Sequence, residues 1–175
     1  MRCGIFCATG THSNLLMWAH YADRHRGAVL GFRTDVPDSI LGQIKAVSYR
    51  EERRFFYKDD AKCLEQALAK EDSDFAKEAY ERLLLTKSPQ WSYEQELRLV
   101  ISNKVKADES DSFVAFHPSE LVQMFLGCRV SPENSLRLAR QARNLNPDIE
   151  IFSAKLVRRK YALAFQKIAA PKSPS

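Results

Sequence analysis

Apolar residues along this chain follow two different spacings, and segments of the two kinds do not alternate in a regular order. Residues 132–145 are apolar at every third or fourth position, through Leu136, Ala139 and Ala142, as in a helix with one buried face. Residues 97–102 form one aliphatic run, as in a strand. The irregular order predicts an α+β fold, with a mixed or mostly antiparallel sheet and flanking helices, rather than a doubly wound fold.

Turn and cap signals set the ends of the other predicted elements. Asn14 is placed to cap a helix, and Gly27 to stop it. We expect helices at 15–26, 35–46, 61–87 (one long helix or a broken pair) and 132–145. We expect strands at 28–33, 46–49, 97–102, 113–116, 124–128, 149–153 and 160–165.

Length and composition predict one soluble domain. The chain has 175 residues, of which 45% are hydrophobic, enough for one core and few for two. We expect the domain to cover 1–168 and a disordered tail to cover 169–175. No apolar run of about 18 residues is present, and the four Cys are irregularly spaced. These features predict a cytoplasmic protein with reduced thiols and no membrane span.

Both Trp residues stand beside ionisable side chains. Trp18 lies in the segment 17–21 with His20, and Trp91 lies in the segment 91–98 with glutamates and an arginine. Aromatic rings mixed with such groups indicate a walled cleft with polar groups inside it. Tryptophans packed in the core beside a hydrogen-bonded ion pair explain the same pattern equally well.

The segment 93–101 carries the candidate catalytic groups. If it is extended, its two-residue period places Glu94, Glu96 and Arg98 on one face. Arg98 would then keep one carboxylate ionised while the other accepts a hydrogen bond or a proton. Glu96, in the middle of the row, is the first catalytic candidate, and we expect it to face solvent. The alternative is an exposed charge ladder on an edge strand.

His20 and Tyr21 are the candidates on the first helix. His20 lies off the apolar stripe of that helix, so it could orient a substrate hydroxyl or phosphate, or it could be an ordinary surface residue. Tyr21 could stack on a base or a nicotinamide ring, or pack in the core. We expect Trp18, Tyr21, Trp91 and Glu96 to surround one cavity.

The chain is mildly basic, and its sequence contains no common metal-binding or dinucleotide-binding motif. The net charge is +5, and basic residues gather at 50–54, 137–143 and 158–160, where they could contact phosphates or form solvated faces. The spacing of Cys3, Cys7, His12 and His20 matches no common zinc site, so we expect no metal. Neither G-x-G-x-x-G nor a P-loop occurs.

Four motifs in order resemble those of the bacterial domain-of-unknown-function family DUF2971. They read M-W-x-H-Y-A-x-x-H-x-G-x-x-L-G-F (17–32), V-S-Y (47–49), W-S-Y-E-x-E-x-R (91–98) and F-L-G-C-R (125–129). The resemblance extends roughly from Ile5 to Phe165. Members of the family usually begin with an aromatic-basic strand and an N-D-P-F-E-like segment. We find neither before the first motif, so we expect the domain to lack the N-terminal segment of the family.

The resemblance implies a fold and a reaction. The order of elements in the family is similar to the split-sheet fold of ADP-ribosyltransferases. By that analogy Trp18, Tyr21 and Trp91 would hold NAD or a nucleotide, Glu96 would bind the nicotinamide ribose, and Glu94 would guide the acceptor. Such families are often toxins or phage-defence effectors, which implies a nucleic acid or a protein as acceptor.

A non-catalytic module is the rival hypothesis. In this interpretation the basic patches around Arg50 and Arg158 bind nucleic acid or a protein partner. The Trp, Glu and Arg residues of segment 91–98 then have a purely structural role.

Overall fold

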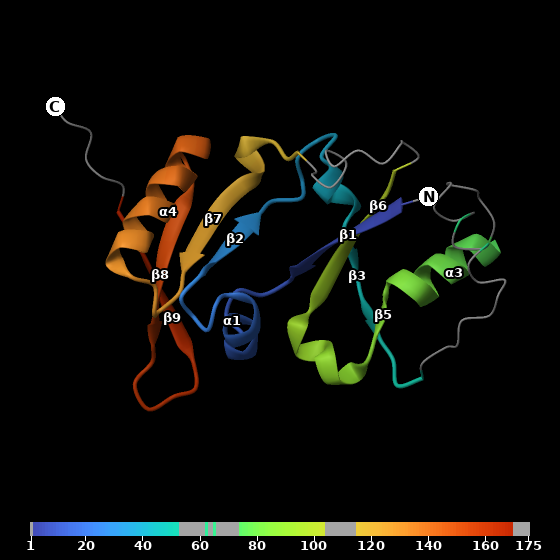
Figure 1. Ribbon diagram of the computed structural model, residues 1–175, viewed down its shortest axis with the longest axis horizontal. Helices are drawn as coiled ribbons and strands as arrows, with labels where there is room; N and C mark the ends of the chain where they lie inside the picture. The colour runs from blue at the N-terminus through green and yellow to red at the C-terminus, as the bar shows by residue number, and fades with distance from the viewer. Residues whose placement is uncertain (1, 53–61, 63–64, 66–73, 104–114, 170–175) are drawn as a thin grey trace. The chain divides into compact units, whose positions relative to one another are not determined.

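The computed structural model describes residues 2–52, 62, 65, 74–103 and 115–169. Contacts within the chain divide it into two compact units (Figure 1). Unit 1 consists of Met1–Gly10 and Gln43–Ala115, and unit 2 of Thr11–Gly42 and Phe116–Ser175. The single domain expected over 1–168 stays a prediction, and we describe each unit by itself.

Unit 1 has a three-stranded antiparallel sheet, whose longest strands come from distant parts of the sequence, and a two-stranded parallel sheet of β4 (Ser48–Tyr49) and β5 (Thr86–Lys87). β1 (Arg2–Thr9) pairs with β6 (Glu96–Asn103), which also pairs with β3 (Lys45–Ala46), so β6 is the central strand. Thr9 lies opposite Glu96 in this register. The remaining elements of unit 1 are α3 (Asp74–Leu84) and the 3₁₀ helix η2 (Pro89–Glu94).

Unit 2 is a four-stranded mixed sheet in the order β2-β7-β8-β9, with one parallel pair, β7 and β8. Helices cover its two faces. Its elements are α1 (Leu15–Tyr21), β2 (Ala28–Phe32), η1 (Ile40–Gln43), η4 (Pro118–Glu120), β7 (Leu121–Leu126), α4 (Pro132–Leu145), β8 (Glu150–Leu156) and β9 (Leu163–Lys167). The predicted α+β class with mixed and antiparallel sheets is confirmed at this level.

The period of two in β7 explains how the sheet is buried on both sides. Met124 and Leu126 pack with Ala139 and Ala142 of α4 in one core cluster. Phe125 points the other way and packs with Trp18 of α1 in a second cluster. A strand covered on both faces needs a continuous apolar run, and the segment 124–126 supplies it.

The first helix ends earlier than its sequence predicts. Asn14 caps it as expected, since its side chain accepts hydrogen bonds from the backbone N–H groups of Leu16 and Met17. The helix then stops at Tyr21, and the prediction of a helix up to 26 is wrong. Residues 23–25 have φ values of 45°, 52° and 69°, a left-handed stretch that breaks the α-helical hydrogen-bond pattern.

Other predicted elements differ from the structure in length. The helix expected at 35–46 is reduced to η1, and the strand expected at 46–49 is divided between β3 and β4. Of the helix expected at 61–87, most of the first part lies outside the described residues, and α3 is the last part. The predicted strand 113–116 lies partly outside the described residues; its last two residues are not in a strand. The predicted tail at 169–175 lies outside them except for Ala169.

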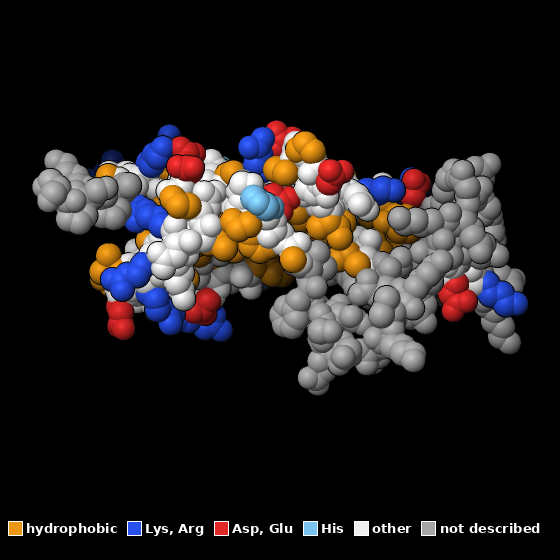
Figure 2. Space-filling model, turned by 90° about the horizontal axis from the view of Figure 1, so that it is seen from above, with side chains coloured by type: hydrophobic (Ala, Val, Ile, Leu, Met, Phe, Trp, Pro, Cys, Tyr) orange, Lys and Arg blue, Asp and Glu red, His pale blue; other side chains and the backbone are white. Residues whose placement is uncertain are grey.

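Charges of both signs are interspersed on the face that Figure 2 shows, as the composition suggests. In the part of the chain that the structure describes, no helix is both long enough and apolar enough to cross a membrane.

Gly127 gives the first testable prediction. A Cβ atom at this position would lie 2.1 Å from the carbonyl oxygen of His25, and this backbone atom cannot rotate away. We expect Gly127→Ala to destabilise unit 2 by about 3 kcal/mol or more, as severe overpacking does. A urea melt followed by circular dichroism measures the loss. Gly4→Ala is the matched control, because a Cβ there meets nothing within 4 Å, and a control that melts equally early would contradict the steric explanation.

Candidate functional site

The predicted site residues are divided between the two units. Trp91, Glu94, Glu96 and Arg98 belong to unit 1, whereas Trp18, His20 and Tyr21 belong to unit 2. The single cavity predicted around both Trp residues therefore stays a prediction.

Glu94 and Glu96 do not lie on one strand, so the predicted row of three charges is wrong in its first member. Glu94 is the last residue of η2, a 3₁₀ helix that begins at Pro89. Gln95 then takes a left-handed conformation, with φ 46° and ψ 49°, and β6 begins at Glu96. The left-handed residue thus separates the two carboxylates into different elements.

Glu96 and Arg98 do share one face of β6, as predicted. The guanidinium of Arg98 donates two hydrogen bonds to the carboxylate, from Nε to Oε1 over 2.7 Å and from Nη2 to Oε2 over 3.1 Å. This fork is the strong geometry for an Arg–carboxylate pair. The third donor of Arg98, Nη1, reaches the carbonyl oxygen of Leu84 at the end of α3 over 2.6 Å.

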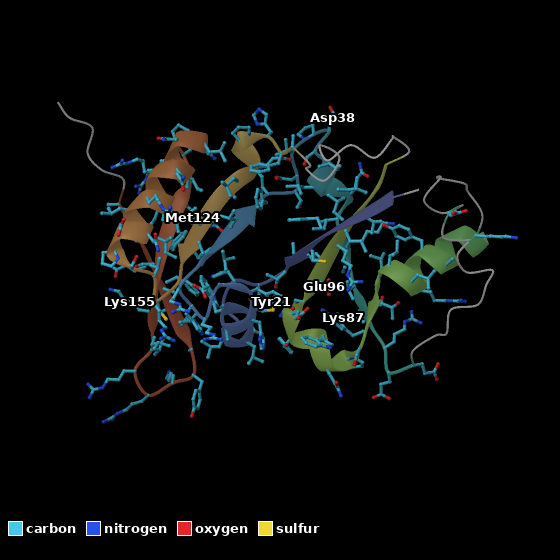
Figure 3. All side chains as sticks on the ribbon, viewed as in Figure 1. Tyr21, Asp38, Lys87, Glu96, Met124 and Lys155 are labelled. Carbon is cyan, nitrogen blue, oxygen red and sulfur yellow. The ribbon has the colours of Figure 1, made fainter. Side chains whose placement is uncertain are left out.

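Lys87 of β5 joins the two glutamates, and the sequence analysis did not select it. Its ammonium lies 2.9 Å from Oε2 of Glu96 and also forms an ion pair with Glu94 (Figure 3). Lys87 sits two residues before Pro89 in a segment without a recognisable motif, so no local signal could have identified it. We call Lys87, Glu94, Glu96 and Arg98 the charge cluster.

The two carboxylates of the charge cluster are buried, and its two cations are partly buried. Glu94 is 3% exposed and Glu96 is 6% exposed, and both expectations for Glu96, a solvent-facing position and an edge-strand ladder, are wrong. The physical reason is the topology: β6 is the central strand, with Leu99 buried on one face and Glu96 on the other. Buried carboxylates of this kind need paired charges, and the cluster contains two of each sign.

The pKa of Glu96 is lowered to about 2. Burial by itself would raise it, but hydrogen bonds from Arg98, Lys87 and the Cys7 thiol favour the charged form and outweigh burial. The pKa of Cys7 is raised, first by burial and then by the negative charge of Glu96 that its thiol contacts. Glu96 is therefore a fixed anion at neutral pH, and Cys7 is a protonated donor.

Two further bonds hold the backbone around the charge cluster. The N–H of Glu96 donates to the phenolic oxygen of Tyr49 over 2.8 Å, and Thr9 Oγ1 donates to the carbonyl oxygen of Glu94 over 2.6 Å. Tyr49 comes from β4 and Thr9 from β1, so both ends of the Glu94–Glu96 turn are anchored to strands. This is the arrangement that keeps a charged group in one position.

Trp91 lies at the surface side of the charge cluster. Its ring is 41% exposed, and the ammonium of Lys87 lies 4.9 Å from the ring centroid, within the range of a cation–π contact. The ring of Tyr93 is 6.0 Å away. An exposed indole next to a buried ion cluster offers a planar surface on which a ligand ring could stack.

A pocket of about 690 Å³ opens on the other side of Lys87. Residues of β3, β4, β5 and α3 line it, with the cations Lys45, Arg50 and Lys87 opposed by Glu51 and Glu81 among others. Its volume is in the range of small-molecule sites. Lys87 is the residue that the pocket and the charge cluster share.

The candidates of unit 2 lie partly in the core and partly at the surface. Trp18 is 1% exposed, and its Nε1 donates to the carbonyl oxygen of His12 over 2.7 Å, so it is a satisfied core residue. His20 and Tyr21 are exposed, with ring centroids 6.3 Å apart. The predicted roles of these three residues in ligand binding stay predictions.

Within the described residues, no group of three or more His, Cys, Asp or Glu side chains is placed to hold a metal ion. The charge cluster satisfies its carboxylates with Lys and Arg instead.

Comparison with known families confirms the resemblance seen in the motifs. Residues 17–99 match the model of the family described as "Protein of unknown function (DUF2971)", so this part of the chain is similar to that family. The match includes the first three motifs, through Leu99, and the fourth motif at 125–129 lies outside it. No curated protein and no solved structure matches the chain.

Acid titration of Glu96 gives the second prediction. The carboxyl takes up a proton near pH 4.5 in the unfolded chain and near about pH 2 in the folded one, so its stabilisation is complete above pH 4.5 and is lost as the pH falls towards 2. We expect Glu96→Gln to lower the free energy of unfolding at pH 7 by about 3 kcal/mol. Urea melts should show that the difference in free energy of unfolding between the variant and the wild type shrinks as the pH falls from 4.5 towards 2.

Glu150→Gln is the control for this titration. Glu150 pairs with Lys167 at the surface, where solvent screens the interaction, so its variant should follow the wild-type melts at every pH. If the difference in free energy of unfolding between Glu96→Gln and the wild type stays constant from pH 7 to pH 2, Glu96 is not held ionised by its partners.

Proposed function

We propose that this chain processes NAD in the manner of ADP-ribosyltransferases, with Glu96 as the group that stabilises positive charge on the nicotinamide ribose. One observation carries the proposal: hydrogen bonds from Arg98 and an ion pair with Lys87 hold the Glu96 carboxylate in one position as an anion. Glu94 precedes it on a tight turn, so two carboxylates meet at the start of the central strand. The split-sheet fold of that enzyme class is part of the same proposal and rests on analogy.

The reaction needs an anion more than a base. When the bond between the ribose carbon and the nicotinamide nitrogen breaks, the nitrogen keeps the electron pair and nicotinamide leaves as a neutral molecule. The ribose carbon becomes positive until an acceptor oxygen or nitrogen adds to it and releases a proton. A carboxylate that is already ionised and already oriented lowers the energy of that cation without reorganising. Glu94 is the second carboxylate, and we assign it to the acceptor.

Neighbouring groups fit the remaining parts of NAD. The exposed ring of Trp91 offers a stacking surface for the nicotinamide or the adenine. Lys87 stands between this ring and the pocket that Lys45 and Arg50 line, so cations are available for the pyrophosphate. Tyr21 and His20, exposed on α1 of unit 2, stay separate ligand-binding candidates on the strength of their sequence motif, whereas Trp18 is enclosed in the core of that unit.

A non-catalytic module is the second candidate function, and one observation favours it. Both carboxylate oxygens of Glu96 already accept hydrogen bonds, Oε1 from Arg98 and Oε2 from Arg98 and Lys87. A substrate hydroxyl would have to share or displace one of these donors. Saturated ion clusters of this kind are common in structural roles, where they fix one packing arrangement.

NAD turnover separates the two functions and is the third prediction. We expect the wild type to release nicotinamide from NAD, and Glu96→Gln to reduce kcat by about a hundredfold or more, as loss of electrostatic stabilisation does. Trp91→Leu should raise KM with kcat nearly unchanged, because the ring binds substrate without contacting the reacting bond. Nicotinamide release by chromatography measures both, at a temperature where melts show each variant to be folded.

The controls address folding and adventitious activity. Glu150→Gln removes an exposed carboxylate of unit 2 and should leave both constants unchanged. Calorimetric titration with NAD tests binding apart from turnover. A wild type that neither binds NAD nor releases nicotinamide, or a folded Glu96→Gln variant with wild-type kcat, would overturn the enzymatic proposal in favour of the non-catalytic module.

A further inference from the structure

The loop between β8 and β9 projects from the sheet of unit 2 as the tip of a hairpin (Figure 1). The backbone N–H of Val157 donates to the carbonyl oxygen of Ala162 over 3.0 Å, and the N–H of Lys160 donates to the carbonyl of Val157 over 3.2 Å. These bonds close a tight turn at its apex. The hairpin tip, residues 157–162, is therefore an ordered structure with its side chains directed by a defined backbone.

The hairpin tip carries charge of one sign only. Arg158, Arg159 and Lys160 occupy its apex and are all exposed. Among the described residues, none of the three forms an ion pair. Every charged residue after Glu150 in the sequence is Lys or Arg, and Lys155 lies on β8 near the tip (Figure 3). Unneutralised cations gathered in this way attract phosphate.

An aromatic ring stands next to these cations without any packing of its own. Tyr161 is 101% exposed, as open to solvent as a tyrosine in an extended peptide. A ring of this size normally buries much of its surface, so one that buries none is unusual. Bases of single-stranded nucleic acids stack on rings presented in this manner, between basic residues that follow the backbone.

The backbone conformation of Arg159 is a second feature of the hairpin tip. Its φ is 60°, in the left-handed region that glycine and asparagine adopt with least strain. An arginine at this turn position is a local departure from the expected turn residue. Departures of this kind concentrate at binding sites, where the side chain itself is needed.

We propose that the hairpin tip binds single-stranded nucleic acid, with Arg158, Arg159 and Lys160 on successive phosphates and Tyr161 stacked on one base. The proposal concerns unit 2 and is independent of any NAD chemistry in unit 1. A duplex fits less well, because its bases are already stacked on one another and leave no face for the tyrosine ring. The hairpin tip would then bring a single-stranded nucleic acid to the protein, as a target or as an acceptor.

An anionic membrane is the competing partner for a basic and aromatic loop. Insertion into a bilayer interface needs apolar side chains at the part that enters first. The apex of this turn is formed by three charged residues in sequence, and the exposed apolar side chain of Leu156 stands on the strand below it. The arrangement places charge outermost, as contact with a phosphate backbone requires.

The test is fluorescence anisotropy with a labelled single strand of about 20 nucleotides, long enough for the site sizes of such proteins. The same sequence as a duplex and vesicles containing phosphatidylserine are the comparison ligands. We expect the wild type to bind the single strand more tightly than the duplex. Tyr161→Ala should weaken binding by about tenfold or more without changing the salt dependence, because stacking releases no counterions.

Charge variants test the phosphate contacts. Replacing Arg158, Arg159 and Lys160 together by Gln should reduce the slope of log affinity against log salt by about 2, as loss of three phosphate contacts to a single strand predicts. Arg159→Gly suits the left-handed backbone, so it should weaken binding while the melt stays at least as stable as that of the wild type. Arg33→Gln removes one exposed positive charge of unit 2 outside the basic segments and is the matched control with unchanged affinity.

Three results would overturn the proposal. Equal affinity of the wild type and the triple variant for the single strand would show that the hairpin tip makes no phosphate contact. Binding of duplex and single strand with equal affinity, unaffected by Tyr161→Ala, would exclude stacking. Binding to the vesicles with none to the single strand would assign the loop to a membrane surface.

Discussion

The carboxylate of Glu96 connects four elements of unit 1, and the arrangement of that unit depends on this connection. Arg98 extends it from β6 to the end of α3, Lys87 links it to β5, and the Cys7 thiol links it to β1. Two of the three donors are charged and all three contact a buried carboxylate, so the network is costly to leave incomplete. Loss of this acceptor would leave Arg98 without its carboxylate partner and Lys87 with Glu94 alone, in a partly buried site.

The same network sets what chemistry the site can perform. A carboxylate with a pKa of about 2 is a weak proton acceptor at neutral pH, so general base catalysis by Glu96 is disfavoured. Stabilisation of a developing positive charge makes no demand on basicity and gains from a fixed orientation. The structural and the enzymatic interpretations therefore use one property, a permanently ionised and immobile oxygen pair, and differ in whether a substrate reaches it.

Local sequence signals predicted the elements that local interactions determine. The helix expected at 132–145 has the same bounds in the structure, because its apolar stripe lies within it and its end signals, Ser131 and Asn146–Pro147, lie directly beside it. The pairing of Glu96 with Arg98 also follows from a two-residue period. Lys87 and the burial of Glu96 depend on a strand, β1, from the far end of the sequence, and the left-handed Gln95 that separates Glu94 from β6 has no residue signature.

The placement of the two tryptophans makes each unit separately visible to spectroscopy. Trp18 is enclosed in the core of unit 2, whereas Trp91 is at the surface of unit 1 above a lysine ammonium. An enclosed indole emits at shorter wavelength than one in contact with water, and a nearby cation perturbs the emission further. Replacing either ring by phenylalanine leaves an intrinsic reporter for the other unit alone. The unfolding of the two halves, and whether a ligand orders one before the other, can thus be followed in the unlabelled protein.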